Sequence, residues 1–269
     1  MIDLPQILLL VAASAVAGAV NSVAGGGTLL TFPSLLAIGQ ISTVANATST
    51  TALWPGQLSS LFGYRKEIQQ NARAVVPLLF IGLLGGATGA YLLTCTAPAL
   101  FDRIVPFLIL LATALFMIQE PLSRWQKARA SGTLPEKTES PVTESPVEEP
   151  LRLSFGIVLF LLLIALYGGY FGAGIGILTL AALGFCGLTN IHQMNGIKNI
   201  FTLGINGIAA ILFMVKGLVH WDIAGLMVLG SLFGGYAGAG IARRIGQKNV
   251  RRIVIFIGFA LTLSLLVKH

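Results

Sequence analysis

The sequence predicts an all-α integral membrane protein built from two repeats, and three observations carry that prediction. Hydrophobic residues make up 55% of the chain, charged residues only 10%, and the mean hydropathy is +0.85, whereas roughly 25% charged residues are usual in a soluble domain. Several apolar segments have the ~20 residues that a helix needs to cross a bilayer. The second half of the chain also repeats the glycine and amide pattern of the first.

The long apolar segments form two groups of four. In chain order they are Leu4 to Val23, Val44 to Tyr64, Val75 to Leu93, Ala99 to Met117, Leu153 to Tyr170, Met194 to Val215, Ile223 to Ile241 and Ile253 to Val267. The residues before the first segment include Asp3 but no Lys or Arg. The N-terminus therefore lacks the basic region of a signal peptide. We therefore expect a retained helix there.

Between the two groups lies a stretch rich in proline and glutamate, residues 119–150. Such a composition cannot bury enough apolar surface to build a core, so it predicts a disordered linker. The chain is then divided into a first transmembrane repeat, residues 1–118, and a second, residues 151–269.

Each repeat is interrupted by a break rich in glycine. The first break holds Gly25, Gly26 and Gly27, and the second is Gly168 to Gly176, which includes Gly174. In hydrocarbon an irregular backbone is tolerated only where it lines a cavity or a binding site. Paired breaks at matching positions are the best sequence indication of a secondary transporter's central site, so we expect the substrate there.

The matching positions follow a nearly constant offset. Asn46 aligns with Asn195 and the pair Gly85-Gly86 with Gly234-Gly235 at 149 residues, while Ala24 to Thr31 aligns with Gly172 to Thr179 at 148. This self-similarity indicates a duplication with one small insertion or deletion.

The orientation of the repeats depends on whether the short segments Thr28 to Ile38 and Ile175 to Phe185 cross the membrane. If they do, the basic residues of 65–73, of the linker and of 243–252 share one face, which fits the positive-inside rule. Opposite them remain Arg103, Lys216 and Lys268. The repeats are then inverted, with both termini outside and the linker in the cytoplasm. The alternative is a parallel repeat with two re-entrant loops, because eleven helical residues span only about 16 Å.

Polar side chains follow each break on the next long segment. In the first half they are Asn46, Thr48, Ser49, Thr50, Thr51 and Gln57, and in the second half Asn195, Lys198, Asn199, Thr202 and Asn206. Helical spacing places most members of each set on one face. Each repeat therefore presents one polar stripe.

Lys198 is the most informative member, because it lies several residues inside an apolar segment. A lysine in hydrocarbon costs several kcal/mol unless it is paired or hydrated. All ten acidic residues fall in loops or at segment ends, so we expect an anionic substrate as its partner, with N–H groups of the glycine breaks completing the site. The alternative is that its side chain snorkels to the interface.

Several other classes of function lack support. The Ser/His/Asp order, HExxH, CxxC and GxxxxGK[ST] do not occur, so the sequence predicts neither a hydrolase nor a nucleotide-driven pump, and no enzyme. Cys95 and Cys186 do not have metal-site spacing, and we expect no metal and no cofactor. The net charge of +7 arises in short loops beside membrane segments and does not indicate nucleic-acid binding.

The motifs AVAGAVNSVAGGGTLLTFPSLL and NATSTTAL, mirrored by YGGYFGAGIGILTLAAL and NGIKNIFT, resemble the TauE/SafE family of sulfite and organosulfonate exporters. The resemblance covers both halves and implies a multi-pass carrier of small sulfur-containing anions in a bacterial inner membrane. It also implies that the path is lined in the first half by Gly25 to Gly27, Pro33, Asn46 and Thr48 to Thr50. The second half departs from the family's pattern at Ile175, Ala181 and Ile197-Lys198, where glycine, proline and Thr-Ser are common. The added lysine would select a more highly charged or bulkier anion.

Together these residues predict a secondary transporter that moves a small anion by alternating access near the midplane. Lys198 would be the charge partner and Gly176 would lie in the second break. The hydrogen-bond donors would be Asn46, Ser49, Thr50, Asn195 and Asn199. An anion channel, a carrier of non-sulfur organic anions and a membrane scaffold are the alternatives. The expected partners are a small anionic substrate and the lipid bilayer, and a homodimer is left open.

Overall fold

The computed structural model confirms the all-α prediction for the part of the chain that it describes, residues 3–23, 25–63, 65–70, 72–132, 154–188, 190–245 and 247–268. The first half contains α1 (Leu4–Val23), α2 (Thr28–Ala37), α3 (Ser42–Gly63), α4 (Arg65–Gln70), α5 (Ala72–Cys95) and α6 (Pro98–Gly132). The second contains α7 (Phe155–Tyr170), α8 (Ile175–Phe185), α9 (Ile191–Val215), α10 (Trp221–Ile245) and α11 (Gln247–Lys268).

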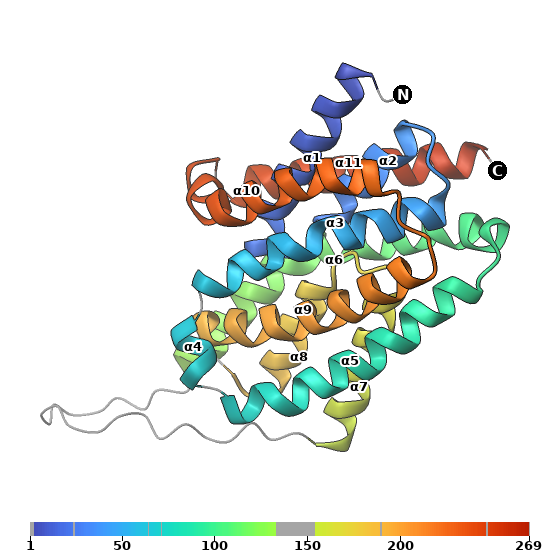
Figure 1. Cartoon of the computed structure of the whole chain (residues 1–269). Helices are drawn as coiled ribbons and strands as arrows, with labels where there is room; N and C mark the ends of the chain where they lie inside the picture. The colour runs from blue at the N-terminus through green and yellow to red at the C-terminus, as the bar shows by residue number, and fades with distance from the viewer. Residues whose placement is uncertain are drawn as a thin grey trace, which may run out of the picture.

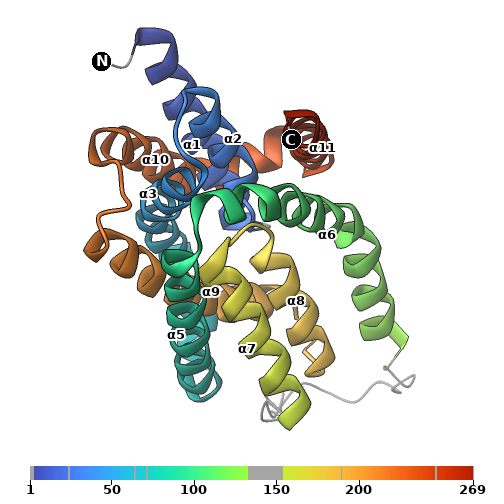
Figure 2. The ribbon, with the colours of Figure 1, turned by 90° about the vertical axis from the view of Figure 1, so that its right-hand side faces the viewer.

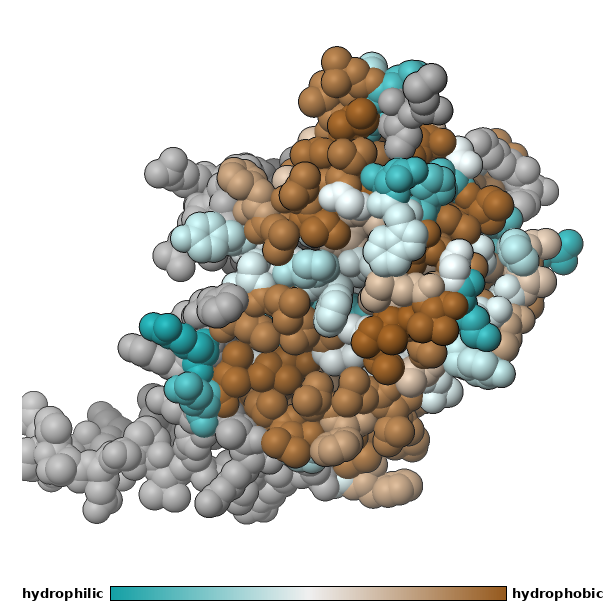
Figure 3. Space-filling view, in the orientation of Figure 1, coloured by the Kyte–Doolittle hydropathy of each residue, from teal (hydrophilic) through white to brown (hydrophobic). Residues whose placement is uncertain are grey.

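Within the described residues, four helices are long and apolar enough to cross a membrane, namely α1, α5, α6 and α9. Shorter apolar helices occur in α2, α7, α8 and part of α11. Large apolar side chains are exposed on α5 and α10, for example Phe80, Leu84 and Leu229 at 63%, 66% and 67%. Figure 3 shows such side chains covering much of one face. An exposed apolar surface of this extent indicates contact with lipid.

The two halves interlock, and the most extensive packing contacts of one half have counterparts in the other. α1 packs along α10 as α7 packs along α5, and α3 packs on α10 as α9 packs on α5. α3 also packs on α9, and Figure 1 shows α3, α9 and α5 side by side through the middle of the molecule. The helices of one repeat therefore bury the helices of the other.

Glycine pairs make these close approaches possible. A Cβ on Gly86 would lie 2.9 Å from Ile205 Cα, and a Cβ on the aligned Gly235 would overlap the backbone of Gly56. Gly56 and Ile205 are themselves 149 residues apart, so the offset seen in the sequence recurs between touching residues. Small residues at helix crossings let backbones approach in this way.

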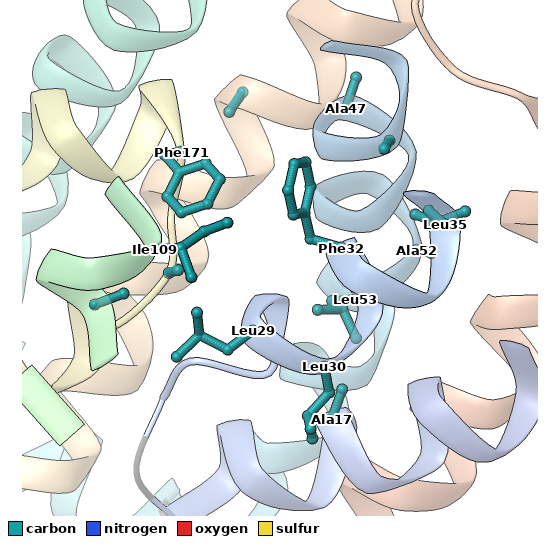
Figure 4. Close-up of a cluster of buried hydrophobic side chains, with 14 of the residues drawn as sticks. Ala17, Leu29, Leu30, Phe32, Leu35, Ala47, Ala52, Leu53, Ile109 and Phe171 are labelled. Carbon is teal, nitrogen blue, oxygen red and sulfur yellow. The ribbon is translucent and has the colours of Figure 1, made fainter. Parts of the chain in front are cut away.

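The short helices α2 and α8 lie inside the bundle (Figure 2). Seven residues of α2 and eight of α8 are buried. Figure 4 shows the apolar cluster around α2, in which Phe32 meets Phe171 of the second break. Their ring centroids are 5.5 Å apart in an edge-to-face arrangement, a favourable geometry for aromatic pairs.

The boundary of the predicted linker needs a correction. The sequence places its start at residue 119, whereas α6 continues to Gly132. Residues 122–130 are mostly good helix formers, including Arg, Gln, Lys and Ala, and adding residues to an existing helix is easier than starting a new one. The rest of the predicted linker, residues 133–150, lies outside the described residues. The division into two repeats and their inverted orientation stay predictions.

Candidate functional site

The two glycine breaks meet. Gly25 and Gly26 have φ angles of +73° and +123°, and Gly172 and Gly174 have φ angles of +80° and +78°, values that residues with a Cβ rarely adopt. A Cβ on Gly25 would lie only 2.7 Å from Cα of Gly176. Glycine is therefore needed for the backbone turn and also for the contact between the breaks.

A small cavity opens where the breaks meet the polar stripes of α3 and α9. Its free volume is about 20 Å³, room for about one water molecule. Both halves contribute equally to the wall, which is formed by Asn21, Gly25, Gly26, Thr28, Thr50, Leu53, Gln57, Gly172, Ile175, Gly176, Lys198, Asn199, Thr202 and Asn206. Three pairs of lining residues are aligned at the offset of 149, namely Thr50 with Asn199, Leu53 with Thr202 and Gln57 with Asn206.

Lys198 is buried in this wall and does not snorkel to the surface. Its side chain is 1% exposed, and its Nζ atom has no hydrogen-bond partner among the described residues. The lining contains no Asp or Glu. A buried ammonium without a counter-ion is strongly unfavourable, so a negatively charged partner would stabilise it.

Two neutral polar atoms of the cavity residues are also buried without a hydrogen-bond partner among the described residues. Asn199 Nδ2 and Gln57 Oε1 are buried, and neither has a hydrogen-bond partner in the described part of the chain. Buried polar groups in folded proteins are nearly always paired. Unpaired atoms that gather in one cavity indicate that a ligand or water completes them.

The side chain of Asn21 caps backbone N–H groups of the first break. Its Oδ1 accepts the backbone N–H groups of Gly26 and Gly27 at 2.8 and 2.7 Å, so the N–H groups ahead of α2 are already paired. The position aligned with Asn21 at an offset of 148 is Gly169, which has no side chain to do the same. No described residue accepts the N–H groups of Gly174 or Ile175 ahead of α8.

Six of the twelve residues predicted for the site line the cavity. They are Gly25, Gly26, Thr50, Gly176, Lys198 and Asn199. Thr202, Asn206 and Gln57, which the sequence places on the polar stripes, line it as well. Asn21 was missed, although an amide in an apolar helix a few residues before three glycines was an available signal.

The other predicted residues of the first half have structural partners. Asn46 Nδ2 donates to Tyr170 O at 3.0 Å, and Thr48 Oγ1 accepts from the backbone N–H of His220 at 3.0 Å. Ser49 shares a hydrogen bond of 2.6 Å with Thr31. A Cβ on Gly27 would lie 2.5 Å from Ala17 O, so this glycine permits close packing on α1. These residues join elements together instead of facing the cavity.

In the second half, Gly174 and Asn195 also lie away from the cavity wall. Gly174 is the N-cap of α8 in a left-handed conformation, packed near Leu115 and Ala112 of α6. Asn195 is half-buried near the start of α9. Among the described residues, no group of three His, Cys, Asp or Glu side chains has a metal-site arrangement.

Comparison with known proteins gives a family and a set of relatives. A family described as "Sulfite exporter TauE/SafE" matches residues 10–265. The chain is 28% identical to a "Probable membrane transporter protein" of Haemophilus influenzae, covering 97% of this chain and 94% of the relative. It is 25% identical to the "Probable membrane transporter protein YfcA" of Escherichia coli K12, covering 93% and 86%.

A relative from Bacillus subtilis has a comparable identity. The "Probable membrane transporter protein YunE" of Bacillus subtilis is 28% identical over 93% of this chain and 95% of its own length. No solved structure matches. The names and the apolar helices together indicate a multi-pass membrane transporter. The comparisons do not support the homodimer that the sequence left open.

Proposed function

Because the chain belongs to the sulfite exporter TauE/SafE family, we propose that it is a secondary transporter of a small sulfur-containing anion, sulfite or an organosulfonate, working by alternating access in a bacterial inner membrane. The observation that carries this proposal is the buried, unpartnered ammonium of Lys198 at the meeting point of the two breaks. Such a charge costs several kcal/mol when it is left unpaired. An anion removes that cost when it binds.

Hydrogen-bond donors around Lys198 suit a sulfur oxyanion. Asn199 Nδ2 and the backbone N–H group of Ile175, both from residues of the cavity wall, have no acceptor among the described residues. The N-terminus of α8 adds the favourable end of a helix dipole. Together these groups offer several N–H donors and one positive charge to one set of substrate oxygens.

The geometry favours a carrier over an anion channel. The cavity has room for about one water molecule, so a sulfonate with its three oxygens enters only after the surrounding helices move apart. α3 and α9, which bear the stripes, pack on each other across the two halves. Movement of one half against the other around this contact would expose the cavity to each side in turn.

The test is counterflow of a labelled sulfonate in proteoliposomes. We expect wild-type protein to show saturable uptake that is driven by unlabelled sulfonate inside, and Lys198→Met to reduce it by more than about 30-fold. Lys216→Met is the matched control, because Lys216 is exposed in the turn that directly follows α9. Unchanged uptake in Lys198→Met would remove the lysine from the mechanism. Single-channel currents would favour a channel, and counterflow with carboxylates alone would favour a carrier of non-sulfur anions.

A further inference from the structure

The two breaks use their backbone N–H groups differently. In the first, residues 25–27 donate theirs to Val20 O and Asn21 Oδ1, at distances of 2.7 to 3.2 Å. The aligned N–H groups of the second break, those of residues 173–175, have no acceptor among the described residues. The second break therefore has backbone donors left for a ligand, whereas those of the first are already paired.

These unpaired donors lie around the cavity that holds Lys198. Ile175 and Gly176, the first two residues of α8, line the cavity together with Lys198. A Cβ on Gly26 of the opposite break would lie 3.4 Å from Gly174 N, so this nitrogen also lies where the breaks meet. Lys198 Nζ is itself buried without a hydrogen-bond partner in the described part of the chain. An ammonium group and a run of N–H groups beside it are the groups that an oxyanion needs.

The carbonyl side of the second break is held by Tyr167 of α7. The Tyr167 hydroxyl donates to Ala173 O at 2.7 Å, and a carbonyl oxygen can only accept, so the direction of this bond is fixed. The ring of Tyr167 packs against two buried apolar clusters of the bundle. The aligned residue of the first half is Ala19, so this hydroxyl has no equivalent there.

This hydrogen bond fixes the peptide that leads into α8. In a trans peptide the C=O and the following N–H point in opposite directions, so the bond to Ala173 O turns the Gly174 N–H away from Tyr167. Gly172 and Gly174, on either side of Ala173, have φ angles of +80° and +78°, and glycine changes its backbone conformation easily. If this peptide turned over, Ala173 O would take the place of the Gly174 N–H beside Gly26. A carbonyl oxygen there would repel an anion.

We propose that Tyr167 is a positioning residue of the anion site. Its hydroxyl holds the second break in the orientation that presents N–H groups, and not a carbonyl oxygen, to the substrate. Tyr167 does not line the cavity, so it acts through the backbone. This inference rests on the proposed function, to which it adds a residue outside the two polar stripes.

The test compares two tyrosines of α7. Tyr167→Phe keeps the ring and removes the hydroxyl from Ala173 O. Tyr170→Phe is the matched control, because the Tyr170 hydroxyl donates at 3.3 Å to Thr96 Oγ1, between α5 and α6. Affinity for methanesulfonate is measured by isothermal titration calorimetry on the purified full-length protein. We expect Tyr167→Phe to weaken binding about tenfold and Tyr170→Phe to leave it within about twofold.

Hydrogen exchange followed by mass spectrometry separates positioning from stability. At saturating methanesulfonate, wild-type protein and Tyr170→Phe should show slower exchange over residues 173–176 and unchanged exchange over residues 25–27. In Tyr167→Phe, at a concentration that saturates this variant, the slowing should be smaller. A purely structural hydroxyl would lower the denaturation midpoint of the anion-free protein and leave both the affinity and the slowing unchanged.

The outcomes separate this inference from the proposed function. Wild-type affinity in Tyr167→Phe, an equal loss in Tyr170→Phe, or slower exchange in the first break in place of the second overturns the inference. A Tyr167→Phe protein that does not fold also overturns it, since the hydroxyl would then serve the fold alone. Loss of binding in Lys198→Met would leave the proposed function standing in each of these cases. Wild-type protein that binds neither methanesulfonate nor sulfite overturns both.

Discussion

The two breaks are similar in backbone and different in chemistry. Both use glycines with positive φ angles to enter a short buried helix, and both reach the same cavity. In the first, Asn21 supplies an internal oxygen to the N–H groups. In the second, a glycine stands at that position, and Lys198 replaces the aligned Ser49. The two halves thus share their backbone arrangement, and a few differences in sequence place the positive charge of the cavity wall in the second half.

The largest expected effect concerns the orientation of the two breaks relative to the membrane. Gly39 and Gly187 follow α2 and α8 at the offset of 148, and an added Cβ would meet nothing within 4 Å at either. If the repeats are inverted, a membrane-impermeant maleimide applied to intact cells labels Gly39→Cys and leaves Gly187→Cys unlabelled. Both variants are made in a background with Cys95 and Cys186 replaced by Ala. Equal labelling of the two positions would favour parallel repeats with re-entrant loops.

The next comparison concerns backbone strain and close contact. Gly25→Ala combines a positive φ angle with a Cβ only 2.7 Å from Gly176 Cα, whereas a Cβ on Gly172 would have Gly168 O at 3.1 Å as its nearest neighbour. We expect Gly25→Ala to destabilise the fold by about 3 kcal/mol or more and Gly172→Ala by about 1–2 kcal/mol. Thermal denaturation followed by size-exclusion chromatography in detergent measures both. Equal losses would show that the contact between the breaks is loose.

Asn21 is the residue whose substitution separates stability from binding. Asn21→Ala leaves two N–H groups without an acceptor and should cost about 2–3 kcal/mol of stability. Asn21→Asp keeps the acceptor and places a negative charge at a helix N-terminus, so its denaturation midpoint should equal or exceed that of wild type. The same charge would neutralise Lys198 across the cavity, and we expect sulfonate affinity to fall about tenfold or more. Wild-type affinity in Asn21→Asp would place the anion away from the first break.

Asn46 gives the smallest expected effect. Its amide donates to Tyr170 O, outside the cavity wall, so Asn46→Leu should cost about 1 kcal/mol of stability and leave sulfonate affinity within about twofold. Titration calorimetry and thermal denaturation of one preparation check both statements. A large loss of affinity at unchanged stability would return Asn46 to the binding site that the sequence proposed.

The polar residues predicted for the site show what helical spacing can and cannot predict. Lys198 was recognisable because a charge inside an apolar segment needs a reason, whatever its neighbours are. Asn46, Ser49 and Thr50 looked equivalent on one helical stripe, yet one bonds the second break, one bonds Thr31 and only Thr50 lines the cavity. Helical periodicity fixes which side chains share a face, and it does not fix which neighbour they meet.

The sequence by itself determined the helical class, the two breaks and the presence of a lysine without an acidic partner in an apolar segment, and it predicted the duplication, because each of these follows from composition, spacing and the cost of polar groups in lipid. Tertiary structure decided that the breaks touch and which polar side chains of the two stripes line the cavity. Those features arise from contacts between residues far apart in the chain. The spacing of residues along the sequence does not show which distant residues come into contact.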